Sequence, residues 1–229
     1  MTVAVKQALS ATEVALAYHA RTKHSLKRYA AGPNASNVSG SISADFSSGI
    51  EPCRNLIFFV HRVEGLQPGL YALPRSPEAQ QSLRKEPRPA FEWQNPEGTP
   101  AQLPFVRLWP ADCRAVARAA VSCHQVIASD SCFSLSMLAE FEPILKANVW
   151  RYRQLHWEAG LLGHVLYLEA EGAGLRGTGI GCYFDDALHD LIGIKTTRFQ
   201  ALYHFTVGRA LTDKRITTLP AYPGRRGKG

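Results

Sequence analysis

The sequence predicts an α+β fold, and two observations lead to that class. Segments with the apolar alternation of strands and segments with helical spacing follow one another without the regular strand–helix–strand order of an α/β protein. The chain of 229 residues has 45% hydrophobic and 20% charged residues, which is typical of a globular protein with enough material for a sizeable core. We find no internal repeat.

The first part of the chain, residues 1–46, is expected to hold a short helix, a basic motif and a linker. Residues 12–19 have apolar positions available for one helical face. The basic run 21–29 follows. Residues 31–43 are rich in turn formers and poor in large apolar side chains, which indicates a loop.

The next part of the chain predicts a pair of strands. Leu56–Val63 and Gly69–Leu73 are rich in β-branched and aromatic residues, and Gly65 and Pro68 between them indicate a hairpin. Residues 74–102 are rich in proline and charge, so we expect a surface excursion with a short helix around residues 78–84.

Four more elements follow before the end of the chain. Asp112 is a plausible N-cap for a helix through Val126. The alternation in Phe133–Phe141 predicts a half-buried strand. Ala201–Val207 is the last predicted strand, and an extended arm from Leu211 to Gly229 closes the chain.

The most informative stretch runs from Trp157 to Gly193. A helix beginning near Tyr152 has so few polar positions that we expect it to be buried on most sides. It runs into a glycine-rich bend and then into a helix with acidic residues at its start. A backbone this bare can approach a flat ligand and present N–H groups to it, although on spacing alone a helix C-cap and a tight connection are the stronger interpretation. The glycines of the bend are Gly172, Gly174, Gly177, Gly179 and Gly181.

Net charge and hydropathy limit the classes of partner. The formal charge of +7 is inflated by the basic tail 224–229, and the remaining charge is scattered, so nucleic-acid binding stays a minor alternative. No apolar run approaches the roughly 18 residues that a membrane span needs, and the N-terminal sequence lacks the features of a secretory signal. We therefore expect a cytoplasmic protein.

Cysteines and acidic clusters predict no metal site. The five cysteines include no CxxC pair, so we expect reduced, mostly buried thiols, with Cys182 a small buried residue rather than a redox group. A metal site is an alternative interpretation of the acidic cluster Asp185, Asp186, His189 and Asp190. Acidic residues at a helix start more often cap the free N–H groups, and we favour that interpretation.

With these elements placed, the chain resembles the nitroreductase-like FMN flavoprotein superfamily, and within it the azoline (thiazole/oxazole) dehydrogenase-like branch. More narrowly, it resembles the C-terminal half of a tandem-domain member. The segments that carry the resemblance are residues 60–73, 122–142, 158–194 and 201–208.

The resemblance implies that residues 47–229 form a nitroreductase-like domain, with a mixed, mainly antiparallel sheet flanked by helices and an extended C-terminal arm. It implies an FMN-dependent oxidoreductase that transfers hydride between NAD(P)H, or a small organic or peptide substrate, and the flavin. It also implies a homodimer. Only residues 30–46 stand where the superfamily carries a long helical insert, which suggests an alternative: a truncated, catalytically weak or inactive relative that acts as a scaffold or partner in peptide modification.

The resemblance also assigns candidate phosphate ligands. Lys23, Ser25 and Lys27 match the basic–Ser–basic motif of the superfamily, and their alternate spacing on an extended stretch would point two cations and a hydroxyl the same way. A solvated basic segment is the competing interpretation. The C-terminal arm usually adds one or two basic residues to the phosphate site, and the candidates are Arg209, Lys214 and Arg215.

Two further segments are implied at the flavin ring. Ser47, Ser48 and Gly49 loosely resemble a loop that edges the flavin, although a plain turn before a strand is at least as good an interpretation. The glycine-rich bend would supply backbone donors near the central and pyrimidine edges of the ring. These residues are Gly177, Thr178, Gly179, Ile180 and Gly181. No catalytic side chain is assigned, since hydride transfer from a nicotinamide requires none.

Overall fold

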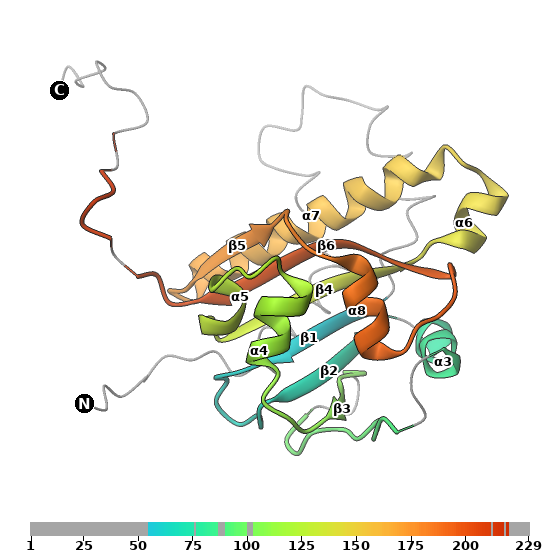
Figure 1. Ribbon diagram of the computed structural model, residues 1–229, viewed down its shortest axis with the longest axis horizontal. Helices are drawn as coiled ribbons and strands as arrows, with labels where there is room; N and C mark the ends of the chain where they lie inside the picture. The colour runs from blue at the N-terminus through green and yellow to red at the C-terminus, as the bar shows by residue number, and fades with distance from the viewer. Residues whose placement is uncertain are drawn as a thin grey trace, which may run out of the picture.

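The computed structural model describes residues 55–75, 77–86, 90–99, 103–211, 213–217 and 219. They form a six-stranded sheet of order β3-β2-β1-β4-β6-β5 with helices on both faces (Figure 1), and every strand pair is antiparallel. The α+β prediction is therefore confirmed. The expected helix 12–19, the basic motif with Lys23, Ser25 and Lys27, and the loop of Ser47, Ser48 and Gly49 lie outside the described residues.

The predicted hairpin opens the described part of the chain. β1 (Asn55–Val60) pairs with β2 (Gly69–Pro74) from Asn55↔Pro74 to Val60↔Gly69. Gly65 has a φ of 77°, which a residue with a side chain rarely adopts. β3 (Val106–Trp109), which pairs with β2 at the edge of the sheet, was not predicted because it is short and follows a proline-rich segment.

β4 (Phe133–Glu140) lies between β1 and β6 (Phe199–Gly208). Its bounds were predicted, but the expectation of a half-buried strand was wrong, because all eight residues are buried. The small polar residues of its alternation are covered too: the Ser136 hydroxyl lies 3.0 Å from His204 Nδ1. Helices cover both faces of the sheet and explain this burial. The alternation of apolar and small polar residues in β4 therefore does not indicate a solvent-exposed face.

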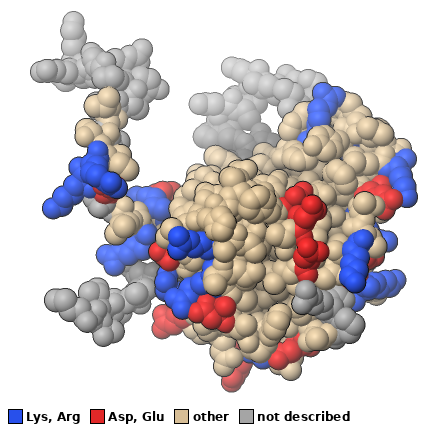
Figure 2. All heavy atoms as spheres, viewed as in Figure 1, with Lys and Arg blue, Asp and Glu red and all other residues tan. Residues whose placement is uncertain are grey.

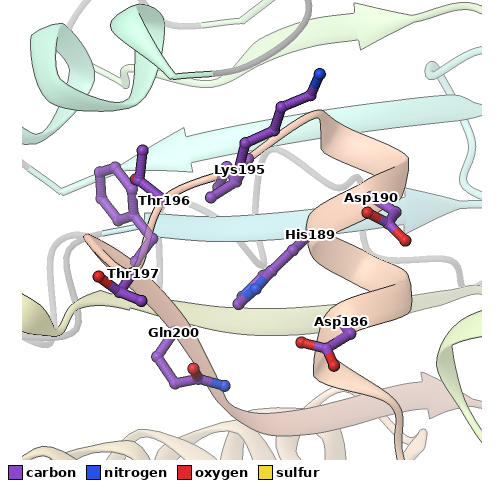
Figure 3. A pocket seen from close by; sticks show the side chains of 9 residues that line it. Asp186, His189, Asp190, Lys195, Thr196, Thr197 and Gln200 are labelled. Atoms are coloured by element: carbon purple, nitrogen blue, oxygen red, sulfur yellow. The ribbon is translucent and has the colours of Figure 1, made fainter.

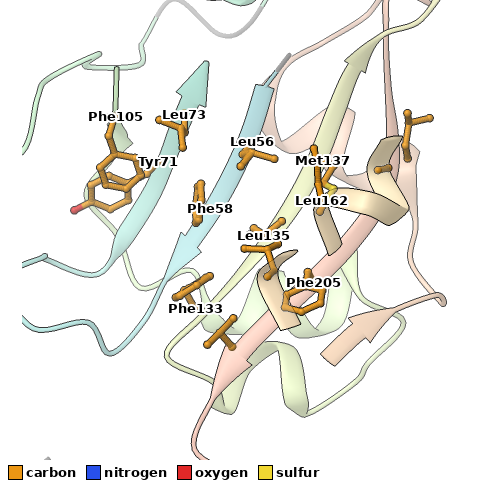
Figure 4. Close-up of a cluster of buried hydrophobic side chains, with 14 of the residues drawn as sticks. Leu56, Phe58, Tyr71, Leu73, Phe105, Phe133, Leu135, Met137, Leu162 and Phe205 are labelled. Carbon is orange, nitrogen blue, oxygen red and sulfur yellow. The ribbon is translucent and has the colours of Figure 1, made fainter. Parts of the chain in front are cut away.

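One face of the sheet carries α6 (Glu142–Ala147) and the long α7 (Arg151–Gly172). Figure 4 shows the apolar layer between this helix and the strands, where Leu162 of α7 lies over Leu135 and Met137 of β4. The start of α7 agrees with the prediction, whereas burial on most sides was wrong. Only one face of the helix is buried in this chain, and Trp157 on the opposite side is 49% exposed.

The other face carries α3 (Pro77–Lys85), α4 (Arg114–Val116), α5 (Ile127–Asp130) and α8 (Asp185–Ile192). The helices α3 and α8 match their predictions closely.

The single helix predicted from Asp112 to Val126 is instead broken into short pieces. Asp112 does accept a hydrogen bond from the Arg114 N–H (3.1 Å), but α4 turns into a five-residue π-helix, η2 (Ala117–Val121). Cys123 and His124 then adopt φ angles of 49° and 62°, which end the helical run. The helix α7 is the longest of the described part, and neither it nor any other described helix has the length and apolar character to cross a membrane.

Candidate functional site

The glycine-rich segment is an edge strand, not a bend. β5 (Arg176–Ile180) pairs with β6 along its whole length, with Gly177 opposite Val207 and Gly179 opposite Phe205. The C-cap interpretation holds one turn earlier, where Gly174 has a φ of 70° and the Leu175 N–H donates to the Ala170 carbonyl at 2.8 Å. Pairing with β6 decides the conformation of β5, which glycine content alone could not indicate.

Aromatic rings explain why the inward positions of β5 are glycines. A Cβ atom added to Gly177 would lie 2.6 Å from Phe205 Cζ, and one added to Gly179 would collide with the Tyr203 hydroxyl. A Cβ on Gly163 of α7 would meet the same tyrosine ring at 2.5 Å. The ring of Tyr203 thus occupies the space between α7 and β5, and that space is not free for a ligand.

The outer edge of β5 is partly occupied as well. The Gly179 N–H donates to the Tyr167 hydroxyl at 2.7 Å, and the Tyr167 ring packs edge-on against Phe205 with centroids 4.8 Å apart. Since alternate residues of an antiparallel edge strand turn their N–H groups the same way, Gly177 shares this outward direction, and Gly181 follows directly after the end of β5. Gly181 is exposed, and no atom lies within 4 Å of its Cβ position. The open end of the glycine segment is therefore Gly181.

The segment that follows, residues 181–184, is largely exposed but anchored to its surroundings. The Phe184 N–H donates to the Val121 carbonyl (2.8 Å), and the Gln125 side chain donates to the Cys182 carbonyl (2.8 Å). The Tyr183 hydroxyl donates to the Leu202 carbonyl at 2.9 Å. These bonds hold the segment between β6 and the loop after η2.

Cys182 and Cys123 form a disulfide across these two loops. The expectation of reduced thiols was wrong for this pair, and Cys182 is exposed rather than buried. Cys113 and Cys132 are free thiols. The two bonded cysteines lie 59 residues apart, so only the folded topology brings them together and no spacing rule could have found them.

A buried histidine lies directly under this segment. The ring of His204 stacks on Tyr183 with centroids 4.1 Å apart, and His204 is only 2% exposed. Its Nδ1 contacts Ser136, while Nε2 has no hydrogen-bond partner among the described residues. Burial lowers the pKa of His204 to about 3, so the ring is neutral at neutral pH. The sequence offered no signal for this group beyond its place in an apolar strand.

One of the candidate phosphate residues, Arg209, lies near the opposite end of β5. Arg209 follows Gly208, which pairs with Arg176 at the start of β5. Gly181 lies five residues beyond Arg176, which corresponds to about 17 Å along an extended strand. Lys214 is exposed, whereas the Arg215 guanidinium is bound to Asp213 at 2.6 Å. Arg209 thus directly follows β6, the strand that pairs with the glycines of β5.

A separate hollow of about 470 Å³ lies beside α8, between that helix and residues 194–200 (Figure 3). It is polar and contains none of the glycines of β5. Its lining consists of Asp186, His189, Asp190, Ile194, Lys195, Thr196, Thr197, Phe199 and Gln200.

At the start of α8, the N-cap position is Phe184 and no side chain caps the helix, so the favoured capping role is not observed; an Asp185 oxygen accepts a hydrogen bond only from the adjacent Asp186 N–H at 3.2 Å. The other oxygen of Asp185 bonds to the Gln200 amide. Within the described ranges, no group of three or more His, Cys, Asp or Glu residues is arranged to hold a metal ion.

The distribution of charge on one face can be followed in Figure 2. Lysine and arginine residues lie mainly towards the periphery, the centre is largely uncharged, and a patch of acidic residues lies over α8, where Asp186 and Asp190 are exposed. This face does not form a continuous basic stripe.

Several solved structures are similar to this chain. A protein from Anabaena variabilis ATCC 29413, assigned as a nitroreductase, aligns with a TM-score of 0.51 and 23% identity over 68% of this chain and 26% of its own length. The Escherichia coli microcin synthetase McbBCD complex with truncated pro-MccB17 aligns with a TM-score of 0.47 and 16% identity, over 69% of this chain and 53% of that one. A protein from Exiguobacterium sibiricum 255-15, assigned as a nitroreductase and solved in complex with FMN, aligns with a TM-score of 0.35 and 18% identity. The alignment covers 47% of this chain and 67% of that one. No protein family and no curated protein matches the sequence.

The fold is thus nitroreductase-like, as the resemblance implied, and the first alignment carries that assignment. The chain spans about a quarter of the length of that protein.

Proposed function

We propose that the protein is an FMN-dependent oxidoreductase that transfers hydride between NAD(P)H, or a small organic or peptide substrate, and the flavin. One observation carries the proposal: on a nitroreductase-like fold, the glycine segment ends in an exposed, side-chain-free position, Gly181, whose surroundings are open. FMN would supply the two-electron chemistry. The residues of this chain would bind it, orient it and leave one face of its ring open.

The fit between β5 and a flavin ring is confined to its open end. Tyr203 and Phe205 fill the α7 side of the strand, and Tyr167 takes the outward N–H of Gly179. The backbone from Gly181 onward is the part that a planar ring can approach. The N–H of Gly181 near the pyrimidine edge would stabilise the negative charge that develops on reduction. In this proposal Gly177, Thr178, Gly179 and Ile180 support the site by packing and pairing rather than by contact.

The phosphate would lie towards the other end of β5. Arg209 is the strongest candidate of the arm because it directly follows β6, and Lys214 is the second. Arg215 is weaker because its guanidinium is already paired with Asp213. Lys23, Ser25 and Lys27 would complete the phosphate site, and Ser47, Ser48 and Gly49 would edge the ring.

A second copy of the chain would cover the site. The exposed face of α7 carries an apolar stripe at helical spacing: Trp150 is 48% exposed, Trp157 49%, Leu161 36% and Leu168 39%. Gly160 lies beside this stripe, and nothing is within 4 Å of its Cβ position, so another helix can approach closely. We therefore propose a homodimer packed through α7, which supplies the burial that the sequence predicted for this helix.

The proposal predicts a yellow protein. Purified full-length chain should retain FMN or take up added FMN near one equivalent, and anaerobic NADH or NADPH should bleach the flavin absorbance. Changing Lys23 and Lys27 to alanine, or Arg209 to alanine, should each weaken FMN retention about tenfold or more, since a charge-assisted bond contributes about 1.5–3 kcal/mol. Arg215→Ala is the matched control and should retain FMN. A colourless protein that takes up no FMN would overturn the enzyme assignment.

The dimer is tested by light scattering coupled to size exclusion. Leu161→Glu places a carboxylate in the apolar stripe and should give a monomer, while His156→Glu, off the stripe on the same helix, should leave the dimer intact. A wild-type monomer at all concentrations would contradict the second-copy proposal.

A further inference from the structure

The Cys123–Cys182 disulfide joins two loops on the helical face that carries α4, α5 and α8 (Figure 1). Cys123 follows η2, and Cys182 lies just after β5. Their Cα atoms are 5.9 Å apart, so the two backbones are placed for a disulfide. The bond closes a loop of the chain that contains β4 and α7, and it fixes residues 181–184 against the loop 122–125.

The accessibility of the sulfur atoms is unequal. Cys182 is exposed, and its neighbour Gly181 has no side chain to shield it, whereas Cys123 is half-buried. The two free cysteines differ sharply from this pair, because Cys113 is buried and burial raises its pKa to about 11. Burial also raises the pKa of Cys132. Of the two disulfide cysteines, Cys182 is therefore the more open to an attacking thiolate, whereas the two free thiols are poor competing nucleophiles.

The loop on the other side of the bond has a strained backbone. Cys123 and the adjacent His124 both have positive φ, a conformation that is unfavourable for a residue with a side chain. The conformation is held by the His124 N–H, which donates to the Arg118 carbonyl at 2.8 Å, and by the Arg118 guanidinium, which donates back to the His124 carbonyl at 3.3 Å. Exposed disulfides next to strained backbone are of the labile kind rather than the purely structural kind.

We propose that Cys123–Cys182 is a redox-active disulfide that exchanges with dithiol compounds and thereby tethers or releases residues 181–184. A thiolate of the dithiol attacks Sγ of Cys182, the disulfide breaks, and Cys123 leaves as a thiolate that takes up a proton from water. The second thiolate of the dithiol then attacks the dithiol sulfur that is bonded to Cys182 in the mixed disulfide. The oxidised dithiol leaves as an intramolecular disulfide, and Cys182 is released as a thiolate that takes up a proton. Two electrons and two protons pass from the dithiol to the protein.

Release has a defined structural consequence. With the disulfide broken, the hydrogen bonds from Gln125 to Cys182 and from Phe184 to Val121 still join the two loops. The Tyr183 hydroxyl bond to the Leu202 carbonyl and the stacking of Tyr183 on His204 still join the segment to β6. Reduction removes the covalent link of this set, and the remaining contacts are individually weak and reversible. The segment 181–184 should therefore open far more often in the reduced protein. This exchange does not depend on FMN binding, so the two proposals can fail separately.

The first test follows the thiols of the folded, full-length protein. Protein purified without reductant is treated with iodoacetamide, then with dithiothreitol, then with N-ethylmaleimide, and peptides are identified by mass. The maleimide should appear on Cys123 and Cys182 and not on Cys113. Hydrogen exchange of the amides in residues 181–184 should be at least about tenfold faster after reduction, while that of β4 is unchanged. Iodoacetamide on Cys123 or Cys182, or reduction only in denaturant, would overturn the proposal.

The second test identifies the attacked sulfur. Cys123→Ser leaves the exposed Cys182 thiol, and Cys182→Ser leaves the half-buried Cys123 thiol. The Cys123→Ser variant should react with a disulfide reagent about tenfold faster than the Cys182→Ser variant. Equal rates would contradict attack at Cys182. Cys132→Ser is the matched control and should keep the disulfide.

Discussion

β4 and β5 flank the same strand, β6, yet they differ in almost every property. β4 lies inside the sheet, is buried along its whole length, and is rich in large apolar residues. β5 lies at the edge, has one buried residue, Ile180, and carries glycines where β4 carries side chains. In β4 the strand supplies the packing atoms. In β5 the neighbours supply them, because the rings of Tyr203 and Phe205 enter the space that the glycines leave.

The difference separates stability from the candidate site. Burial of apolar side chains on both faces of β4 stabilises the folded state, and this burial is the largest contribution that a strand makes to the free energy of folding. The end of β5 contributes little burial, but it leaves a bare backbone, an exposed disulfide and a buried neutral histidine within one region. The following predictions test that division, from the largest expected effect to the smallest.

Leu135→Ala in β4 should lower the free energy of unfolding by about 2–5 kcal/mol, because Leu135 is 1% exposed and its removal leaves a cavity in the layer under α7. Urea unfolding measures the change. The matched edge variant is Thr178→Ala in β5, for which we expect about 1 kcal/mol or less. Equal losses at the two positions would show that the edge is as important to folding as the centre.

Gly179→Ala should destabilise the protein by about 1–3 kcal/mol, because the new methyl group enters the space of the Tyr203 ring. Tyr203→Phe removes the colliding hydroxyl and should recover part of the loss in a double-mutant cycle. Gly181→Ala is the control, since its Cβ position is open, and it should change the unfolding free energy by no more than about 0.5 kcal/mol. If the double-mutant cycle gives no coupling energy between positions 179 and 203, the packing of the Tyr203 ring against Gly179 is contradicted.

The buried His204 should make stability fall in acid. Its pKa is about 3 in the folded protein against an ordinary 6.5, so below pH 6.5 the unfolded chain binds a proton that the folded chain does not. The unfolding free energy should therefore drop by about 1.4 kcal/mol per pH unit as the pH falls from 6.5 towards 3. Burial lowers the pKa of His61 and His189 too, which adds to the slope with the same sign.

Urea titrations at several pH values measure this slope. His204→Phe should reduce it by about 1.4 kcal/mol per pH unit, and Tyr183→Leu, which uncovers the ring, should reduce it in part. An unchanged slope in His204→Phe would mean that the histidine is not held neutral by burial.

The smallest effect is expected at the start of β5. Arg176 and Glu171 form an ion pair at 2.8 Å, and both side chains are more than half exposed. Removing it with Arg176→Ala should cost at most about 1 kcal/mol and less at high salt. A larger, salt-independent loss in thermal unfolding would show that this end of the strand has a packing role.

The same contrast explains which elements could be predicted. Strands such as β1 and β4 carry continuous or alternating apolar residues, and α8 combines helical spacing with acidic residues in its first turn, so local sequence and tertiary structure agree. β3 and α6 are short and adjoin prolines, which hides their periodicity. β5 was predicted as a bend because its conformation comes from pairing with β6 and from rings contributed by other elements.

The candidate site was predictable only in part. The glycine segment was found, but its packing partners are set by topology: Tyr203 reaches Gly163 and Gly179 from a different strand. The disulfide between Cys123 and Cys182 and the stacking of Tyr183 on His204 likewise join residues that are distant in sequence. The roles of the candidate phosphate residues remain predictions. Arg209 directly follows β6, which pairs with the glycines of β5, whereas Lys23, Ser25 and Lys27 lie outside the described residues.

The central claim is that a flavin ring occupies the open backbone at Gly181, and an FMN titration followed by quenching of flavin fluorescence tests it most directly. Gly181→Leu fills the space next to the backbone without a clash inside the chain, as does the control Gly172→Leu at the end of α7. We predict that FMN binding weakens at least about a hundredfold in Gly181→Leu, or about 2.7 kcal/mol, and is unchanged in Gly172→Leu. Equal and tight binding by both variants would contradict the claim.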